Sequence, residues 1–273
     1  MIENLTTEAI QLLKNLIATQ SFSSEEDNTA VIIENWFKDN EIDFKRSNHN
    51  VYAFNKFFNK EKPTLLLNSH HDTVKPNSAY TRDPLKPEII DGKLFGLGSN
   101  DAGGCLVSLI ALFTYFYNHK NLKYNLIIVA SAEEESSGKN GLNSVLPILP
   151  TIDVAIVGEP TLMQDVRITD AYSNKEVLEI IKNSVNVEVK ERSLRLNSSS
   201  IPKEHALVKA GIALGRETYG SPTLSDQAVL TCPSLKLGPG DSLRSHTADE
   251  FIFVNEIEEG IKIYINLLTD VIV

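Results

Sequence analysis

The sequence predicts an α/β fold in which a mainly parallel, mixed sheet is flanked by helices. Short, continuous apolar runs, such as residues 125–132 and 153–159, are typical of strands that are covered on both faces. Segments with helical spacing of apolar residues alternate with these runs along the chain. The composition, 42% hydrophobic and 23% charged residues, is ordinary for a globular protein of 273 residues.

The individual elements follow from local patterns. Residues 1–19 predict an amphipathic helix, because Ile10, Leu13, Leu16 and Ile17 would share one face. Residues 24–40 predict a helix whose first turn is acidic, where the helix dipole favours negative charge. Residues 101–119 are apolar on nearly all sides, which indicates a well-buried helix. The remaining expected elements are strands at 51–57, 64–70, 125–132, 153–159 and 232–238, and helices at 203–215 and 255–272.

Charge and cysteine content narrow the function classes. The chain has 36 acidic and 26 basic residues and a formal net charge of −10. This balance argues against a nucleic-acid or anionic-membrane partner, because both attract a basic face. No apolar run of about 18 residues predicts a membrane span, and residues 1–19 lack the pattern of a signal peptide. Cys105 and Cys232 have no nearby partner, so we expect a reducing, cytoplasmic setting rather than a disulfide framework.

Several apolar runs end in side chains of the types that commonly bind metal ions. In an open α/β sheet, ligands bind beyond the carboxyl ends of the strands, so these side chains are expected to converge. Asp101 lies directly before the apolar helix, and a glycine loop after residues 232–238 leads to His246. The other groups that follow apolar runs are His70, His71 and Asp72; Glu133, Glu134 and Glu135; and Glu159.

Two histidines and several carboxylates are a ligand set for zinc, and cobalt or manganese would suit the same ligands. Five ligands with a central acid suit two divalent metal ions about 3.5–4 Å apart that share one carboxylate. Asp72 lies two residues after His70 and faces the same way, so it can orient the histidine ring. Adjacent glutamates can divide the work, one binding metal and one accepting a proton from water.

Five ordered motifs carry a resemblance to a known family. The stretches "SHHDTV", "GLGSNDAGG", "SAEEESSG", "VGEPT" and "RSHTADEF" are similar to motifs of the dinuclear-zinc M20 metallopeptidases and deacylases. The segment "TRDPLKPEIIDGKLFGLGS" most resembles the acetylornithine deacetylase branch. The match spans roughly residues 64–160 and 232–252, and it implies the zinc-exopeptidase type of catalytic domain.

The resemblance also implies roles for individual residues. It implies that His70, Asp101 and Glu159 hold one metal ion, and that Asp101, Glu135 and His246 hold the other. It implies that Glu134 is the catalytic base and that Asp72 orients His70. A cis peptide bond after Asp101 is a further expectation from the family.

Several of these residues also suit roles without a metal. The Glu133–Glu135 run alone suits a solvated helix start, and His246 alone suits a surface histidine. His71 is expected to point away from His70 because of strand alternation. Arg244 could bind a substrate carboxylate, or it could be a surface or ion-pair arginine. The neighbouring residues Gly103, Gly104 and Cys105 are expected in close packing and core positions rather than in a phosphate site.

The resemblance fails after the "VGEPT" stretch. Family members carry a complete lid domain there, which holds the dimer interface, whereas residues 165–191 suggest only a strand, a helix and a strand. The predicted division is therefore a catalytic domain in two parts, 1–163 and 198–273, around a remnant of a small α/β lid at 164–197. Either the protein has a shortened lid, or the sequence lacks an internal segment near residues 163–166. A homodimer is expected only with a complete lid, and a monomer otherwise.

The favoured function is a metal-dependent hydrolase that removes the acyl group from an N-acyl amino acid, most like acetylornithine. The expected partner is therefore a small molecule, with neither nucleic acid nor membrane. Two alternatives stay open: a dipeptidase or aminopeptidase of the same family, and a catalytically silent metal-binding scaffold with an incomplete lid.

Overall fold

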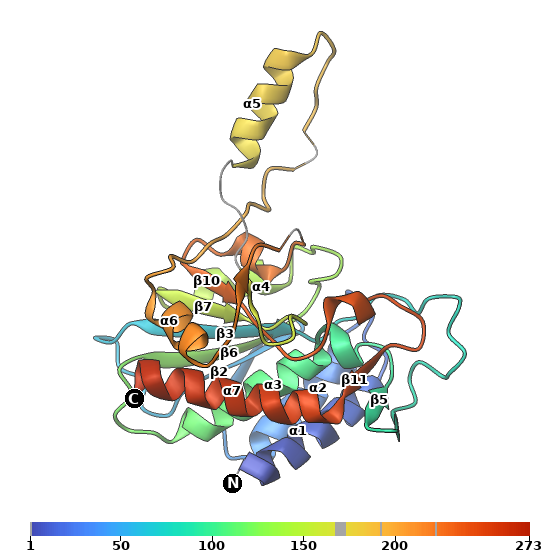
Figure 1. Cartoon of the computed structure of the whole chain (residues 1–273), viewed down its shortest axis with the longest axis vertical. Helices are drawn as coiled ribbons and strands as arrows, with labels where there is room; N and C mark the ends of the chain where they lie inside the picture. Colours follow the sequence, from blue (N-terminus) through green and yellow to red (C-terminus); the bar gives the residue numbers. More distant parts are fainter. Residues whose placement is uncertain (1, 167–172, 192, 222) are drawn as a thin grey trace.

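The computed structural model describes residues 2–166, 173–191, 193–221 and 223–273 (Figure 1). Within these residues the main sheet has eight strands in the order β1-β2-β6-β3-β7-β10-β8-β9. The central strands β6, β3, β7 and β10 run parallel, and the β1–β2 hairpin and β8 add antiparallel pairs. The predicted mainly parallel, mixed sheet is therefore confirmed. The strand bounds are β1 (Phe44–Ser47), β2 (Asn50–Phe54), β3 (Thr64–His70), β6 (Asn125–Ser131), β7 (Val154–Val157), β8 (Asp165–Val166), β9 (Thr218–Tyr219) and β10 (Ser234–Lys236).

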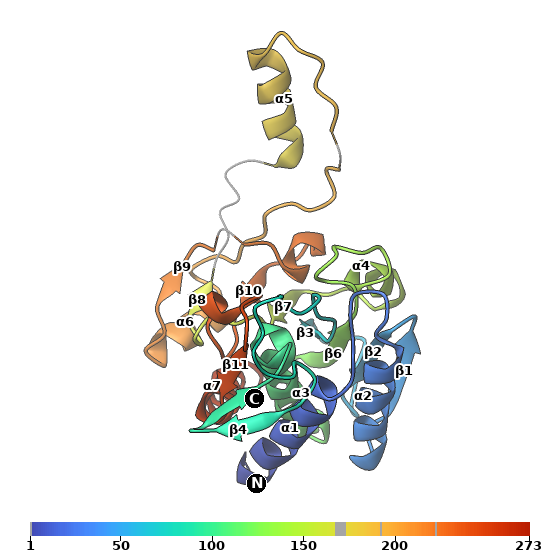
Figure 2. The same ribbon diagram turned by 90° about the vertical axis from the view of Figure 1, so that its right-hand side faces the viewer.

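Four helices cover one face of the sheet (Figures 1 and 2). They are α1 (Ile2–Ile17), α2 (Asp27–Asp39), α3 (Gly104–Tyr117) and α7 (Val254–Ile272), and α6 (Ala206–Ala213) packs against α7. Helix α3 is buried almost all round, as its apolar sequence predicts, because it lies between α1, α7 and the sheet. A second, smaller core forms on the other face beside α4 (Leu142–Val145) and η2 (Leu146–Ile148).

A small antiparallel sheet joins two segments that are far apart in the sequence. Its strands are β4 (Glu88–Ile90), β5 (Lys93–Phe95) and β11 (Phe251–Phe253), in the order β11-β5-β4. Strand β5 leads into the single-turn η1 (Ser99–Gly103), and β11 follows the short helix η4 (Ser242–Arg244). This pairing brings the residues around Asp101 next to those around His246.

Helix α5 (Asn174–Ser184) stands away from the rest of the molecule (Figures 1 and 2). It begins with a capping box, in which Ser173 and Glu176 bond each other's backbone N–H. None of its residues is buried, and its apolar side chains Val177, Ile180 and Ile181 are exposed.

The expected strand–helix–strand remnant is only partly formed. The described start of the first strand is β8, which pairs with β10 of the main sheet, and residues 167–172 lie outside the described residues. The second expected strand is wrong, because residues 185–191 contain no strand. A strand needs hydrogen bonds from a neighbouring strand, and this half-lid brings no sheet of its own. The division into 1–163, 164–197 and 198–273 stays a prediction.

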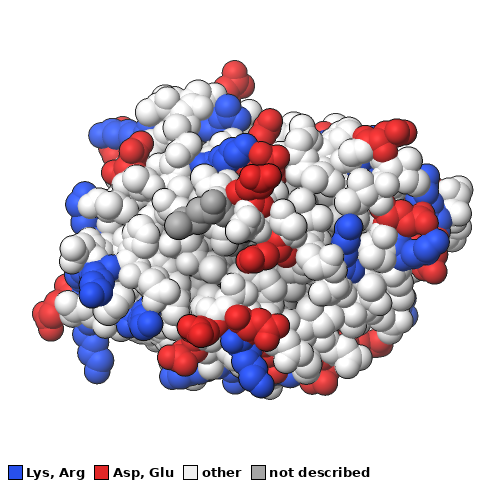
Figure 3. All heavy atoms as spheres, turned by 90° about the horizontal axis from the view of Figure 1, so that it is seen from below, with Lys and Arg blue, Asp and Glu red and all other residues white. Residues whose placement is uncertain are grey.

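The surface seen from below in Figure 3 shows lysine and arginine side chains scattered among acidic ones. The formal net charge of −10 is a property of the whole chain, and this face shows both signs interspersed. In the part of the chain that the structure describes, no helix is long and apolar enough to span a membrane.

Candidate metal centre

The five predicted ligands lie at one edge of the main sheet. His70 is the last residue of β3, Glu135 follows β6, and Glu159 follows β7. These three strands are parallel neighbours, so their carboxyl ends meet. Asp101 lies in η1 at the start of α3, and His246 follows η4. Residues that are spread over much of the chain are thereby brought together.

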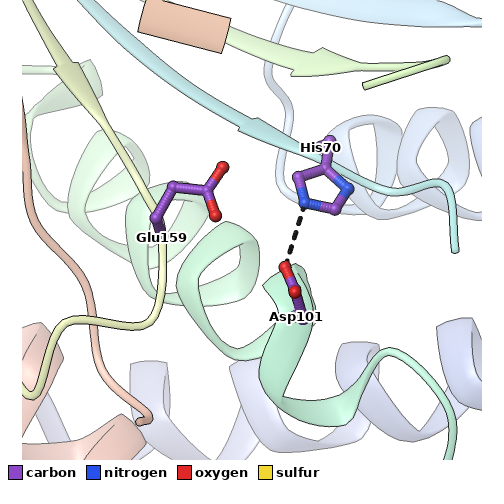
Figure 4. A group of neighbouring side chains, drawn as sticks. All are labelled: His70, Asp101 and Glu159. Carbon is purple, nitrogen blue, oxygen red and sulfur yellow. Dashed lines mark ion pairs between the residues drawn. The ribbon is translucent and has the colours of Figure 1, made fainter. Parts of the chain in front are cut away.

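The ligands form two groups that share Asp101. His70, Asp101 and Glu159 each offer one ligand atom, and these atoms lie within 4.8 Å of one another. Figure 4 shows the three side chains, from β3, η1 and the end of β7, pointing toward a common space. In this group the distance from His70 Nε2 to Asp101 Oδ1 is 3.4 Å.

The second group consists of Asp101, Glu135 and His246, again within 4.8 Å of one another. His246 Nε2 lies 3.0 Å from Glu135 Oε2 and 3.5 Å from Asp101 Oδ2. The two carboxylate oxygens of Asp101 thus face different groups, Oδ1 toward His70 and Oδ2 toward His246. This is the arrangement that a carboxylate shared between two cations requires.

The residues of both groups fit divalent cations. His70 Nε2 and Glu159 Oε1 are buried without a hydrogen-bond partner among the described residues. A buried polar atom without a partner is costly, and a metal–ligand bond would satisfy both atoms. Imidazole nitrogens and carboxylates are the ligands that zinc and similar ions take in proteins.

Crowded acids dominate the electrostatics of the site. Burial raises the pKa of Glu159 to about 7, against the lowering effect of Lys236 and His70. Burial lowers the pKa of His70, but the carboxylates of Asp101, Asp72 and Glu134 outweigh it and hold that pKa well above its ordinary value. Positive charge is therefore favoured at this site, and bound cations would supply it.

Asp72 fixes the orientation of the His70 ring. His70 Nδ1 lies 3.0 Å from the backbone carbonyl oxygen of Asp72 and 3.4 Å from its carboxylate oxygen Oδ1. A proton on Nδ1 can be donated there, which leaves the Nε2 lone pair facing Asp101 and Glu159. The sequence predicts the carboxylate for this role, whereas the shorter contact is to the backbone of the same residue.

Asp72 has a second function that the sequence did not suggest. Its carboxylate accepts hydrogen bonds from the backbone N–H groups of Glu134 at 3.0 Å and Glu135 at 3.1 Å. The hydroxyl of Ser23 also donates to it, at 2.6 Å. One side chain therefore holds both the His70 ring and the loop after β6.

Glu134 belongs to neither ligand group and stands beside the first one. Its Oε2 lies 3.9 Å from His70 Nε2, and it lines a cleft of 410 Å³ together with Asp101, Glu135 and His246. Burial raises the pKa of Glu134 well above its ordinary value, and the negative charge of Glu159 adds to this against His70. A carboxyl group with a raised pKa suits proton transfer near neutral pH.

Glu250 anchors the loop that carries Asp101. Its buried carboxylate accepts hydrogen bonds from the backbone N–H groups of Gly98 at 3.0 Å, Asn100 at 2.8 Å and Asp101 at 2.9 Å. The peptide bond between Asp101 and Ala102 is cis, as predicted. Sequence reasoning missed Glu250, although it lies in the quoted "RSHTADEF" motif. It also missed Asp226, which is buried and accepts from Ser131 Oγ at 2.5 Å.

The remaining candidates lie outside the two groups. His71 points away from His70 as predicted, and its ring contacts Thr29 Oγ1 and the His49 carbonyl oxygen. The guanidinium of Arg244 is paired with both carboxylate oxygens of Glu256, at 2.7 and 2.8 Å. Arg244 therefore forms an ion pair, which is one of its two expected roles, and binding of a substrate carboxylate stays a prediction.

The expected close packing next to Asp101 is confirmed. A Cβ at Gly103 would meet the Gly98 carbonyl oxygen, and one at Gly104 would meet the side chain of Ile252. Cys105 is fully buried in the core, as expected.

The chain matches the acetylornithine deacetylase of Shigella sonnei (strain Ss046) with 33% identity over 172 residues, which cover 58% of this chain and 44% of that protein. The matched part is thus less than half of the relative's length.

Two solved structures share the fold at low sequence identity. Human carnosine dipeptidase 1 is 12% identical, with a TM-score of 0.70 over 98% of this chain and 97% of that chain. A dinuclear metal-binding peptidase of the M20 family from Bacillus subtilis is 13% identical, with a TM-score of 0.68 over 97% of this chain and 98% of that chain. Residues 66–270, most of the sequence, match peptidase family M20/M25/M40. The chain therefore belongs to this family.

Proposed function

We propose that this protein is a hydrolase that removes the acyl group from N-acyl amino acids and depends on two divalent metal ions. Zinc is the favoured metal. The observation that carries the proposal is the arrangement around Asp101. Two ligand groups share its carboxylate, and Glu134 stands beside them without belonging to either. Metal binding and proton transfer would thus fall to different side chains. Metal-assisted hydrolysis of an amide uses both functions.

In this proposal His70, Asp101 and Glu159 hold one ion, and Asp101, Glu135 and His246 hold the other. When bound, the ions would act as Lewis acids that acidify water and polarise a carbonyl group. Asp72 would keep the Nε2 lone pair of His70 directed at its ion, and Glu250 would keep Asp101 in place.

Glu134 would carry the proton transfer. Its carboxylate would accept a proton from a water molecule as the water oxygen bonds to the acyl carbon. The same carboxyl group would then donate that proton to the amine as the carbon–nitrogen bond breaks, so that the base becomes the acid. The two backbone hydrogen bonds to Asp72 would hold the loop of Glu134 still during both transfers.

An N-acyl amino acid is the proposed substrate class because the chain is similar to an acetylornithine deacetylase. The test is to strip the purified 273-residue chain of metal, reload it with zinc, cobalt or manganese, and measure release of acetate from N-acetyl-L-ornithine. The Glu134→Gln variant is the matched control. A dipeptide tested in parallel distinguishes a deacylase from a peptidase of the same family.

We expect metal-dependent acetate release by the unaltered chain and none above background by the variant. Hydrolysis of the dipeptide alone would replace this proposal with the peptidase alternative. A protein that binds metal ions and hydrolyses neither compound would be a silent scaffold.

A further inference from the structure

The cleft beside the ligand groups contains a buried lysine to which the mechanism above gives no role. Lys236 is the last residue of β10, and the residue is 4% exposed. Its Nζ donates a hydrogen bond to the hydroxyl oxygen of Thr223 at 2.9 Å. Among the residues that the structure describes, no carboxylate oxygen lies within 4.0 Å of this Nζ, the longest distance of an ion pair.

A buried ammonium group with a single hydroxyl partner is an unusual arrangement. An ammonium has three N–H donors, and burying its charge is costly unless an anion compensates it. Thr223 accepts one of the three hydrogen bonds and brings no charge. The side chain is therefore suited to a partner that binds from the cleft.

Strand register places Lys236 on the same face of the sheet as the ligands. Lys236 is paired with Val157 of β7, and Val157 is paired with Asn68 of β3. Paired residues point to the same side, and so do residues two positions further along each strand. Two positions after Asn68 and Val157 come His70 and Glu159. The positive charge of Lys236 accordingly lowers the pKa of Glu159, although burial outweighs it and raises that pKa to about 7.

The cleft offers an anion one place to bind away from the metal ligands. Among the described lining residues Lys236 is the only lysine or arginine, and Asp101, Glu134, Glu135 and Glu159 are acidic. Tyr219, Ser221 and Thr223 also line the cleft, and the Ser221 hydroxyl lies 2.8 Å from the Thr223 hydroxyl. A chain of hydroxyl groups thus leads to the ammonium.

We propose that Lys236 is a specificity-determining residue whose ammonium group binds a carboxylate of the substrate, with Thr223 fixing its position. The inference rests on the proposed function, because it takes the cleft to hold an N-acyl amino acid. Two sources share this ligand chemistry: the α-carboxylate of the amino acid, and the terminal carboxylate of a dicarboxylic acyl group. The alternative is a structural role, in which Lys236 only offsets the charge of Glu159.

The test measures binding directly and does not depend on turnover. Calorimetry is carried out on the zinc-loaded protein with the Glu134→Gln substitution, which leaves the ligands intact. The probes are N-acetyl-L-ornithine, N-succinyl-L-ornithine and the α-carboxamides of both. Lys236→Met removes the charge at similar length, Lys236→Arg keeps it, and Thr223→Val removes the hydroxyl acceptor. Lys262→Met is the control, because Lys262 is an exposed residue of α7 paired with Glu258.

We expect Lys236→Met to weaken binding of the carboxylate that it contacts by roughly 30-fold or more. If the α-carboxylate is the partner, the two compounds with a free α-carboxylate lose affinity and neither α-carboxamide does. If the acyl carboxylate is the partner, only the two succinyl compounds lose affinity. Lys236→Arg should retain most of the discrimination, and Thr223→Val should lose part of it with the same ligand preference. Lys262→Met should change nothing.

Equal losses for all four compounds together with a lower zinc content would overturn the inference in favour of a purely structural lysine. Unchanged binding of all four compounds in Lys236→Met, or no binding of any probe to the parent protein, would overturn it too. Failure of the proposed function looks different. In that case Lys236-dependent binding of a carboxylate persists, while the chain with Glu134 intact releases no amine from any probe.

Discussion

The Asp72 carboxylate accepts a hydrogen bond from the backbone N–H of Glu134, with 3.0 Å between Oδ1 and N. The same side chain contacts the His70 ring and the N–H of Glu135. Asp72 thus links His70, a proposed ligand of one ion, to Glu135, a proposed ligand of the other. It also links both to Glu134, the proposed base. Rigid support of this kind matters because small displacements of reacting groups cost large factors in rate.

Replacing Asp72 by Asn should therefore impair catalysis without unfolding the protein. The amide keeps the size of the side chain but turns an N–H₂ group toward a backbone N–H that needs an acceptor. We expect kcat for N-acetyl-L-ornithine to fall by about 10–100-fold, the usual cost of losing a group that supports metal ligands. A Ser23→Ala variant is the milder comparison, since it removes only the hydroxyl contact. Full activity of Asp72→Asn would contradict the positioning role.

The adjacent glutamates should respond differently to the same substitution. Glu134→Gln cannot accept a proton, so turnover should fall by about 10²–10⁴-fold while both metal ions stay bound. Glu135→Gln removes a charged ligand and should lower the bound metal content instead. Elemental analysis of both variants beside steady-state kinetics separates the two effects. If Glu134→Gln loses an ion and Glu135→Gln keeps both, the two assignments are reversed.

Metal removal should destabilise the folded chain. The acids of the two ligand groups repel one another without cations, and an ion that binds only the folded state stabilises it by mass action. Free zinc at 100 times its dissociation constant should raise the free energy of unfolding by about 2.7 kcal/mol. Urea titrations of the stripped and reloaded protein measure the difference. The shift should shrink in Asp101→Ala, which lacks the shared ligand, and an equal shift there would place the ions elsewhere.

Arg244 should prove structural. Its guanidinium pairs with Glu256 and lies over the rings of Phe251 and Phe253. Arg244→Lys keeps the charge but loses the two-pronged contact, so we expect it to lower the free energy of unfolding by about 1–3 kcal/mol. The KM for N-acetyl-L-ornithine should change by less than about threefold, well under 1.4 kcal/mol. A large rise in KM at unchanged stability would give Arg244 the substrate-binding role.

The 273-residue chain should be a monomer with slow turnover. The family resemblance implies that a complete lid holds the dimer interface and also a histidine that reaches the partner's active site as a catalytic donor. Losing one such donor typically costs about 10²–10³-fold in kcat. Light scattering after size-exclusion chromatography measures the mass. Ile180→Glu on exposed α5 is the control, and we expect it to leave that mass unchanged. A dimer that dissociates in this variant would show that α5 alone can form an interface.

Local sequence patterns determined the scaffold and the ligand types. Apolar runs of strand length predicted β3, β6 and β7, because burial on both faces leaves a continuous hydrophobic run. The candidate metal ligands at the ends of these runs were expected to meet, because parallel neighbours end at one edge of a sheet. Helix α3 could be predicted for the same reason, since a segment that is apolar all round is stable only when buried.

Only the tertiary structure decided which polar groups support the site. Asp72 bonds the Glu134 N–H, Glu250 bonds the Asp101 N–H, and Lys236 faces the cleft from β10. The two hydrogen bonds link residues 62 and 149 positions apart, and no local periodicity encodes such pairs. The strand expected at 185–191 is not formed, for the same reason. A strand is completed by hydrogen bonds from another strand, so its existence depends on what the fold places beside it.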